Sequence, residues 1–154
     1  MRLEPLIKPE LTFVLDGIGG RDELLGKLAD SIASASENID GAALEAALTA
    51  REEQAPTSTP EGVAFPHAMY DGATESFVAV ARVNGGVKFG HKDHPPADLV
   101  FVLVGPPDSA WQHVSILARL ARICHAPNAL SCIRGAGDAQ SLYDCLCAED
   151  ARHG

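Results

Sequence analysis

The sequence has few basic residues and no long hydrophobic run, and both absences restrict what the protein can do. Only 12 Lys and Arg stand against 21 Asp and Glu, which gives a formal net charge of −9 and an isoelectric point near 5.0. Because no basic stripe is available to neutralise phosphates, the composition argues against nucleic acid as a partner. The longest apolar run, 99–105, is far too short to cross a bilayer, so we expect no membrane insertion.

Cysteine is also scarce, and its spacing suits neither an easy disulfide nor a zinc site. All four cysteines, Cys124, Cys132, Cys145 and Cys147, lie in the last third of the chain, and no signal-peptide core follows the first residues. Cys145 and Cys147 are too close in sequence to bridge readily, and pairs with zinc-ligand spacing are lacking. We therefore expect reduced, mostly buried thiols in a cytoplasmic protein. The weaker alternative is a zinc set made from Cys124, His125 and Cys132.

Length and hydrophobic pattern predict a single α/β domain over residues 1–154. The 154 residues, 46% of them hydrophobic, suffice for one domain with a substantial core. Strands are predicted at 11–15, 63–65, 77–83 and 99–104, with a short return at 87–89. Helices are predicted at 21–34, 40–51, 110–124, 127–134 and 139–148. Strand 99–104 is apolar throughout, which favours the centre of the sheet. The alternation indicates a layered sandwich, a mixed sheet of about five strands with helices on both faces.

His67 is the first candidate for chemistry, because it follows a short apolar strand and a proline in the stretch GVAFPH at 62–67. Proline fixes φ and donates no backbone hydrogen bond, so we expect the strand ladder to end before His67. A histidine held there can serve as a base, a metal ligand or a nucleophile. It can equally be a turn residue that only bonds nearby backbone, and these six residues leave the alternatives open.

His113 and Arg51 are candidates for binding a phosphate group. His113 is expected in the first turn of helix 110–124, where the partial positive charge of a helix N-terminus lowers a histidine pKa and attracts anions. Arg51, at the end of the second helix, can supply a guanidinium for bidentate phosphate binding. Taken singly, His113 is also explained as a buried histidine bonded to a carbonyl. Arg51 is likewise explained as a charge that complements its helix dipole.

Helix 110–124 carries three further expectations. Its periodicity places Trp111, Val114 and Leu117 on one apolar stripe, with Trp111 as a core or edge anchor of the helix. His113 shares a side with Ile116, Leu117 and Leu120, so it is also expected to point at least partly inward. Arg119 and Arg122 lie three residues apart and are predicted on the solvated face. The alternative for these two arginines is a docking rim for an acidic patch on a partner.

Several motifs follow one another along nearly the whole chain: Arg51-Glu52, GVAFPH at 62–67, DHPPADLV at 93–100, GPP at 105–107, HVSILARLA at 113–121 and SLY at 141–143. In this order they resemble the enzyme IIA components of the bacterial phosphotransferase system, fructose/mannitol type. That family includes a nitrogen-regulatory branch. The alignment without gaps puts the family's arginine on Arg51 and its phosphorylated histidine on His67.

The resemblance implies a phosphoryl-group carrier, a phosphotransferase that requires no cofactor and no metal. His67 would be the phosphorylated nucleophile, accepting the group from the histidine of an HPr-type carrier protein. It would pass the group to the cysteine of an enzyme IIB partner, or its phosphorylation would signal to a regulatory target protein. Arg51 and His113 would hold the phosphoryl oxygens and offset their charge. The oligomeric state is left open, a homodimer included.

Two departures from the family pattern concern the partner-facing surface. The family's Ser-Thr-Gly-x-Gly-Asn-Gly loop reads PTSTPEG at 56–62. Glu61 is therefore expected beside a phosphohistidine, which it would repel unless it points away. Met69 stands where the family often has a basic residue after the active histidine.

Two other functions compete with the phosphoryl carrier. One is a metallohydrolase that uses His67, His91, His94 and His113, although no HExxH-type helical spacing is present. The other is a non-catalytic, regulatory protein-interaction module on the same fold.

Overall fold

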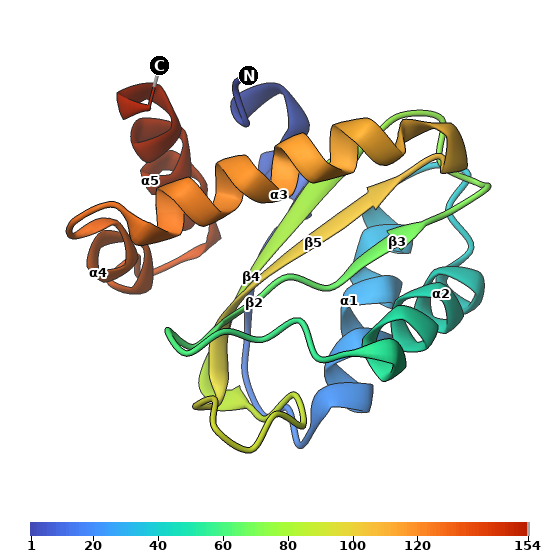
Figure 1. Ribbon diagram of the computed structural model, residues 1–154, viewed down its shortest axis with the longest axis horizontal. Helices are drawn as coiled ribbons and strands as arrows, with labels where there is room; N and C mark the ends of the chain where they lie inside the picture. The colour runs from blue at the N-terminus through green and yellow to red at the C-terminus, as the bar shows by residue number, and fades with distance from the viewer. Residues whose placement is uncertain (154) are drawn as a thin grey trace.

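Five β-strands form one mixed sheet at the centre of the computed structural model, which describes residues 1–153 (Figure 1). The strands are β1 (Thr12–Leu15), β2 (Val63–Ala64), β3 (His67–Met69), β4 (Phe77–Val87) and β5 (Ala97–Gly105). Their order is β1-β4-β5-β2, and β3 continues the line of β2 along β5. Because β4 and β5 are antiparallel while the other pairs are parallel, the predicted mixed sheet is confirmed.

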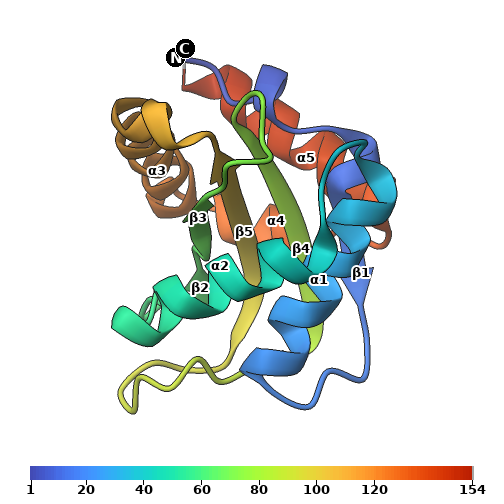
Figure 2. The same ribbon diagram turned by 90° about the vertical axis from the view of Figure 1, so that its right-hand side faces the viewer.

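Helices cover both faces of this sheet (Figures 1 and 2). One face carries α1 (Arg21–Ala35) and α2 (Gly41–Gln54). The other carries α3 (Ala110–His125), α4 (Ala129–Arg134) and α5 (Ala139–Arg152). Short 3₁₀ helices lie at Glu4–Leu6, Pro9–Leu11 and Pro107–Ser109. The predicted layered α/β sandwich is therefore confirmed. At the start of α2 the Asp40 side chain caps the helix by accepting from the backbone of Ala42 and Ala43.

β5 is the central strand because both of its faces are apolar. Its side chains alternate between the two cores, in keeping with the two-residue period of a strand. Those facing α1 and α2 are Val100, Val102 and Val104, and those facing α3 are Leu99, Phe101 and Leu103. All six are fully buried. Each contributes about 1.5–3 kcal/mol from burial, which makes this strand the main source of the sheet's stability.

The edge of the sheet beside β5 differs from the prediction. The strand ladder was expected to end at Pro66, but pairing resumes at the next residue. His67, the first residue of β3, lies opposite Leu103 of β5. The reason is that Pro66 lacks a donor and still has an acceptor, since its carbonyl accepts from the Leu103 backbone at 3.0 Å. His67 is therefore anchored within the sheet.

The predicted return strand at 87–89 is also absent from the described residues as a separate element. β4 instead runs on to Val87, which pairs with Ala97, after an irregularity that begins past Arg82. Gly85 and Gly86 have φ values of +87° and +69°, a conformation that glycine adopts without steric cost. The two glycines bend the strand without ending it.

On α3 the predicted apolar stripe through Trp111 and Val114 was wrong, whereas the inward position predicted for His113 is confirmed. Trp111 is 73% exposed and Val114 is 70% exposed, whereas His113, Ile116 and Leu120 are buried against the sheet. Both sets fit a 3.6-residue period, and residues two apart on a helix point in nearly opposite directions. Packing against the sheet buries the stripe of α3 that carries Ile116 and Leu120.

Asp150, in α5, holds the N-terminal segment and α3 together. Its fully buried carboxylate accepts hydrogen bonds from the backbone N–H groups of Leu3 and Glu4 and from the Arg2 side chain, at 2.8 to 3.1 Å. The Arg119 guanidinium also donates to it, at 2.7 and 2.9 Å. Arg119 is only 6% exposed, so the predicted solvated position of this arginine was wrong. Burial raises the pKa of Asp150, but these hydrogen bonds outweigh it and lower the pKa overall.

We expect Asp150→Asn to lower the free energy of unfolding by about 3–5 kcal/mol, because it leaves the buried Arg119 charge uncompensated. The control is Asp22→Asn, which removes an exposed partner of Arg21 and should cost less than about 1 kcal/mol. Urea denaturation at neutral pH measures both variants.

The same carboxylate gives the stability a pH dependence with a defined sign. Since folding lowers the pKa of Asp150, its contribution is present above the ordinary Asp value and is lost as the pH falls through the folded value. The wild type should therefore lose more stability than Asp150→Asn below about pH 4. Equal losses in the two proteins would contradict the role given to Asp150.

Candidate functional site

The His67 ring is fixed at the start of β3 by two hydrogen bonds. Its Nδ1 lies 2.9 Å from the Phe65 carbonyl, and its Nε2 lies 3.1 Å from Nε of Arg51. A guanidinium only donates, so Nε2 must offer a lone pair, and the ring proton then resides on Nδ1 and is donated to Phe65. The arrangement holds His67 as a neutral imidazole whose basic nitrogen faces Arg51.

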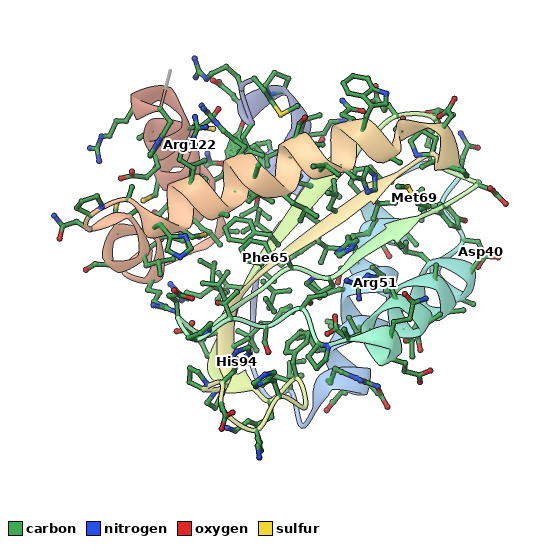
Figure 3. The ribbon with its side chains drawn as sticks, in the orientation of Figure 1. Asp40, Arg51, Phe65, Met69, His94 and Arg122 are labelled. Carbon is green, nitrogen blue, oxygen red and sulfur yellow. The ribbon has the colours of Figure 1, made fainter. Side chains whose placement is uncertain are left out.

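Arg51 reaches this position from the last turn of α2 (Figure 3). Its Nη1 donates to the Ala55 carbonyl at 3.0 Å, which steadies the guanidinium at the helix end. The next residue, Glu52, is buried and accepts from the backbone N–H and hydroxyl of Thr57 at 2.6 and 2.7 Å. Glu52 thereby fixes the loop that leads from α2 toward β2. Sequence reasoning gave Glu52 no role, although its place in the Arg-Glu pair was the available signal.

His113 enters the site from the other face of the sheet, on the first turns of α3. It is 3% exposed, and neither of its ring nitrogens has a hydrogen-bond partner among the described residues. Burial lowers the pKa of His113, and the nearby His67 lowers it further, so the ring is neutral near pH 7. Because an unpaired buried polar group is costly, the ring is suited to a polar group that arrives from outside.

Gly105, the last residue of β5, makes room for His113. A Cβ atom at this position would collide with Nε2 of His113 and with Oγ of Ser76. Ser76 is buried and donates to the side-chain carbonyl of Gln112 at 3.0 Å. Gly105 also pairs with Met69, so β3 ends directly beside it. Sequence reasoning assigned neither Gly105 nor Ser76 to the site, and the GPP turn at 105–107 was the one signal available.

Glu61 lies at the other end of this strand line. Its carboxylate is 3.2 Å from Nε2 of His125 at the end of α3, and its carbonyl accepts from Arg134. The extended chain from Val63 to His67 spans about 13 Å at 3.3 Å per residue. The side chain of Glu61 turns toward α3 and away from β3, so Glu61 takes the expected alternative in which it points away from His67.

Of the histidines in the rival metal site, His91 and His94 do not join His67 and His113 in a ligand cluster. The rings of His91 and His94 stack on each other in the loop before β5, with centroids 3.7 Å apart. Nδ1 of His94 is 2.9 Å from Oγ of Ser58. Within residues 1–153 no three His, Cys, Asp or Glu side chains are arranged to hold a metal ion. The metallohydrolase and the Cys124-His125-Cys132 zinc set therefore lack a ligand cluster in the part of the chain that is described.

The cysteines are less buried than expected. Cys124 is buried, but Cys132 is exposed and Cys145 and Cys147 are partly exposed, and all four are free thiols. The prediction of mostly buried thiols was thus wrong for three of them.

No helix among residues 1–153 combines the length and apolar character needed to cross a membrane.

Comparison with known proteins places this geometry in a family. The sequence model of the family described as "Phosphoenolpyruvate-dependent sugar phosphotransferase system, EIIA 2" matches residues 5–148. This chain belongs to the EIIA 2 family. The predicted resemblance to enzyme IIA components is thereby confirmed, and the family transfers phosphoryl groups within that system.

This EIIA 2 protein is similar to known proteins in sequence and to solved structures in fold. A nitrogen regulatory protein of Bradyrhizobium diazoefficiens is 30% identical over 146 residues, which cover 95% of each chain. The crystal structure of nitrogen regulatory protein IIA-Ntr from Neisseria meningitidis has a TM-score of 0.82 at 24% identity, over 93% of this chain and 97% of that one. Enzyme IIA of mannitol from Escherichia coli, solved in complex with phosphorylated enzyme IIB, has a TM-score of 0.75 at 15% identity, over 92% and 97%. The two structures share the fold.

We expect the histidines of this EIIA 2 protein to titrate in a defined order. Burial and His67 lower the pKa of His113, whereas a bond to the Ala121 carbonyl and the Glu61 carboxylate raise the pKa of His125. His113 should therefore gain its proton below the ordinary histidine value of 6.5 and His125 above it. Ring chemical shifts followed by NMR across pH 4–9 measure both, with His113→Gln and His125→Gln for assignment. Protonation of His113 at or above the pH of His125 would contradict the site geometry.

Proposed function

We propose that this protein is a phosphoryl carrier that forms a phosphohistidine at Nε2 of His67. The observation that supports the proposal is the Nε2 lone pair, presented by a tautomer that the Phe65 carbonyl fixes, beside the Arg51 guanidinium and near the buried, unpaired His113. Phosphoryl transfer requires a nucleophile and donors that stabilise the charge on the phosphoryl oxygens, and His67, Arg51 and His113 can supply them.

Transfer to the protein forms one bond and breaks one. Nε2 of His67 attacks the phosphorus of a phosphohistidine on an HPr-type carrier, and the nitrogen of that carrier leaves with the electron pair of its N–P bond. Positive charge then develops on the His67 ring. The Phe65 carbonyl, which already accepts from Nδ1–H at 2.9 Å, stabilises this charge without any rearrangement.

Arg51 and His113 act on the transferred group. As the N–P bond forms, Nε of Arg51 exchanges its contact with Nε2 for phosphoryl oxygens, and the planar guanidinium can hold two of them. His113 donates a ring N–H to a third oxygen, which provides the partner that its buried nitrogens lack. The phosphoryl charge thus meets donors that are already in position.

The phosphoryl group then passes to a protein partner. We propose the cysteine of an enzyme IIB as the acceptor, because the solved mannitol relative is a complex of enzyme IIA with phosphorylated IIB. Exposed apolar side chains near the site suit such docking. Met69 on β3, labelled in Figure 3, is 41% exposed, and the exposed Trp111 and Val114 are close to His113 in the sequence of α3. The relative named as a nitrogen regulatory protein favours a second use, in which the phosphorylation state of His67 signals to a regulatory target.

The direct test of the carrier function is intact-mass spectrometry after incubation with phosphoenolpyruvate, enzyme I and an HPr-type carrier. The wild type should gain one acid-labile phosphoryl group and His67→Ala none. His113→Gln and Arg51→Gln should be phosphorylated about 10²–10³-fold more slowly, the typical cost of losing one transition-state donor. His94→Gln, a change in the remote loop, should match the wild type. If the folded wild type gains nothing from several carriers, the non-catalytic interaction module is the better function.

Gly105→Ala tests the placement of His113 without changing a reacting side chain. The added methyl group collides with His113 and Ser76, so we expect a stability loss of about 1–3 kcal/mol and slower phosphoryl transfer to His67. Gly137→Ala is the matched control, because a Cβ at that glycine meets nothing within 4 Å. Denaturation and phosphorylation rates should separate the two variants. A Gly105→Ala protein with the wild-type transfer rate would show that His113 does not need its present position.

A further inference from the structure

A cavity of about 230 Å³ lies where three segments that are distant in sequence meet. The segments are the 3₁₀ helix Pro9–Leu11, the turn 36–39 after α1, and the loop 72–75 after β3. Figure 2 shows the first two side by side, with the N-terminal segment in blue next to the end of α1. None of the proposed phosphoryl-binding residues lines the cavity, so it requires its own explanation.

Hydrogen bonds hold the walls of this cavity in place. The Tyr70 hydroxyl accepts from the Asp40 backbone N–H at 3.0 Å, which joins the turn after β3 to the start of α2. The Tyr70 carbonyl accepts from the Ala73 N–H, also at 3.0 Å. On the N-terminal wall, the Lys8 carbonyl accepts from the Thr12 hydroxyl at 2.9 Å. The cavity is therefore largely preformed, as ligand pockets usually are.

The floor of the cavity is apolar. Three lining side chains, Leu11, Ala73 and Phe77, are buried in the core, and Ile39 packs against the same core while partly exposed. The cavity is smaller than the pockets of about 300–1,000 Å³ that bury drug-sized ligands. Its dimensions and its floor therefore suit a small molecule with an aliphatic part.

Four charged side chains also line the cavity: Lys8, Glu10, Glu37 and Glu75. All four are exposed, and none has an ion-pair partner among residues 1–153. Three carboxylates and one ammonium leave two negative charges uncompensated. The C-terminal end of α1 adds partial negative charge, and its last turn has no basic residue. The lining therefore favours a ligand with two cationic groups and one anionic group.

We propose that this cavity binds a basic amino acid. The ligand carboxylate pairs with Lys8, and the two cationic groups pair with the carboxylates of Glu10, Glu37 and Glu75. The aliphatic stem of the ligand packs on the apolar floor. The proposal is independent of the function assigned to His67, and it rests on a preformed cavity that combines an apolar floor with charges of both signs.

Free L-lysine is the probe for this site, and two analogues each lack one of its charged groups. Norleucine keeps the α-ammonium group, the carboxylate and the stem but has no terminal ammonium group. Cadaverine keeps both ammonium groups and the stem but has no carboxylate. Backbone amide shifts of the nitrogen-15-labelled full-length protein, followed by NMR at neutral pH and constant ionic strength, measure the affinity of each compound.

Lysine should shift the amides of 36–39 and 72–75 saturably, with a Kd of about 1 mM or lower. Norleucine and cadaverine should each bind about tenfold more weakly, because each forfeits a charge-assisted contact. Shifts that do not saturate, or that lie outside the walls of the cavity, would overturn the proposal. Equal affinity for all three compounds would do so as well, since the charged groups would then not be recognised.

Variants test which side chains of the protein hold the ligand. Replacing Glu37 and Glu75 together by Gln should weaken lysine binding about tenfold. Lys8→Gln should make lysine and cadaverine bind alike, because the carboxylate then loses its partner. The matched control replaces two exposed carboxylates outside the cavity, Glu53→Gln with Asp144→Asn, and should keep the affinity of the wild type.

The control also separates recognition from the net charge of the protein. If it weakens lysine binding as much as the Glu37 and Glu75 variant does, the ligand responds only to overall charge and the proposal is overturned. His67→Ala should bind lysine as tightly as the wild type, whatever its phosphorylation shows. A loss of binding in His67→Ala would place lysine at the phosphoryl site and would equally overturn the proposal.

Discussion

The pairing of β5 with strands on both of its sides fixes the positions of the candidate site residues. The parallel register with β3 sets His67 opposite Leu103, and the end of β5 sets Gly105 against His113. This register is strongly determined, because a slip of one residue would turn the buried side chains of β5 toward the wrong core. Hydrophobic burial along one strand thus fixes the polar geometry at its carboxyl end.

The site is assembled from three elements that are not consecutive in the sequence. α2 provides Arg51, β3 provides His67, and α3 brings His113 from the opposite face of the sheet. A buried imidazole without a partner destabilises the fold, and the apolar packing of Ile116 and Leu120 on the same helix offsets that cost. Proteins retain such a cost where a ligand supplies the missing partner, which is the role proposed for the phosphoryl group.

α3 links the two ends of the molecule. Its first turns hold His113, and further along the helix Arg119 binds the carboxylate of Asp150 in α5. The N-terminal segment is attached to the same carboxylate. The end of the fold that carries α5 is therefore braced by buried polar contacts, whereas at the His67 end the buried ring nitrogens of His113 have no partner among the described residues. A protein with a net charge of −9 thus places cationic and neutral donors where we propose that the phosphoryl group is bound.

The sequence by itself determined β5 and the periods of the helices, because burial on both faces of a strand, or along one face of a helix, leaves a local pattern. It did not determine which stripe of α3 meets the sheet, since the Trp111 and Ile116 stripes satisfy the same period. Only the tertiary structure decided that Arg119 pairs with Asp150, that Glu61 turns to His125, and that Gly105 accommodates His113. Each of these contacts joins residues from separate elements, and their partners are chosen by packing of the whole fold, which no local pattern encodes.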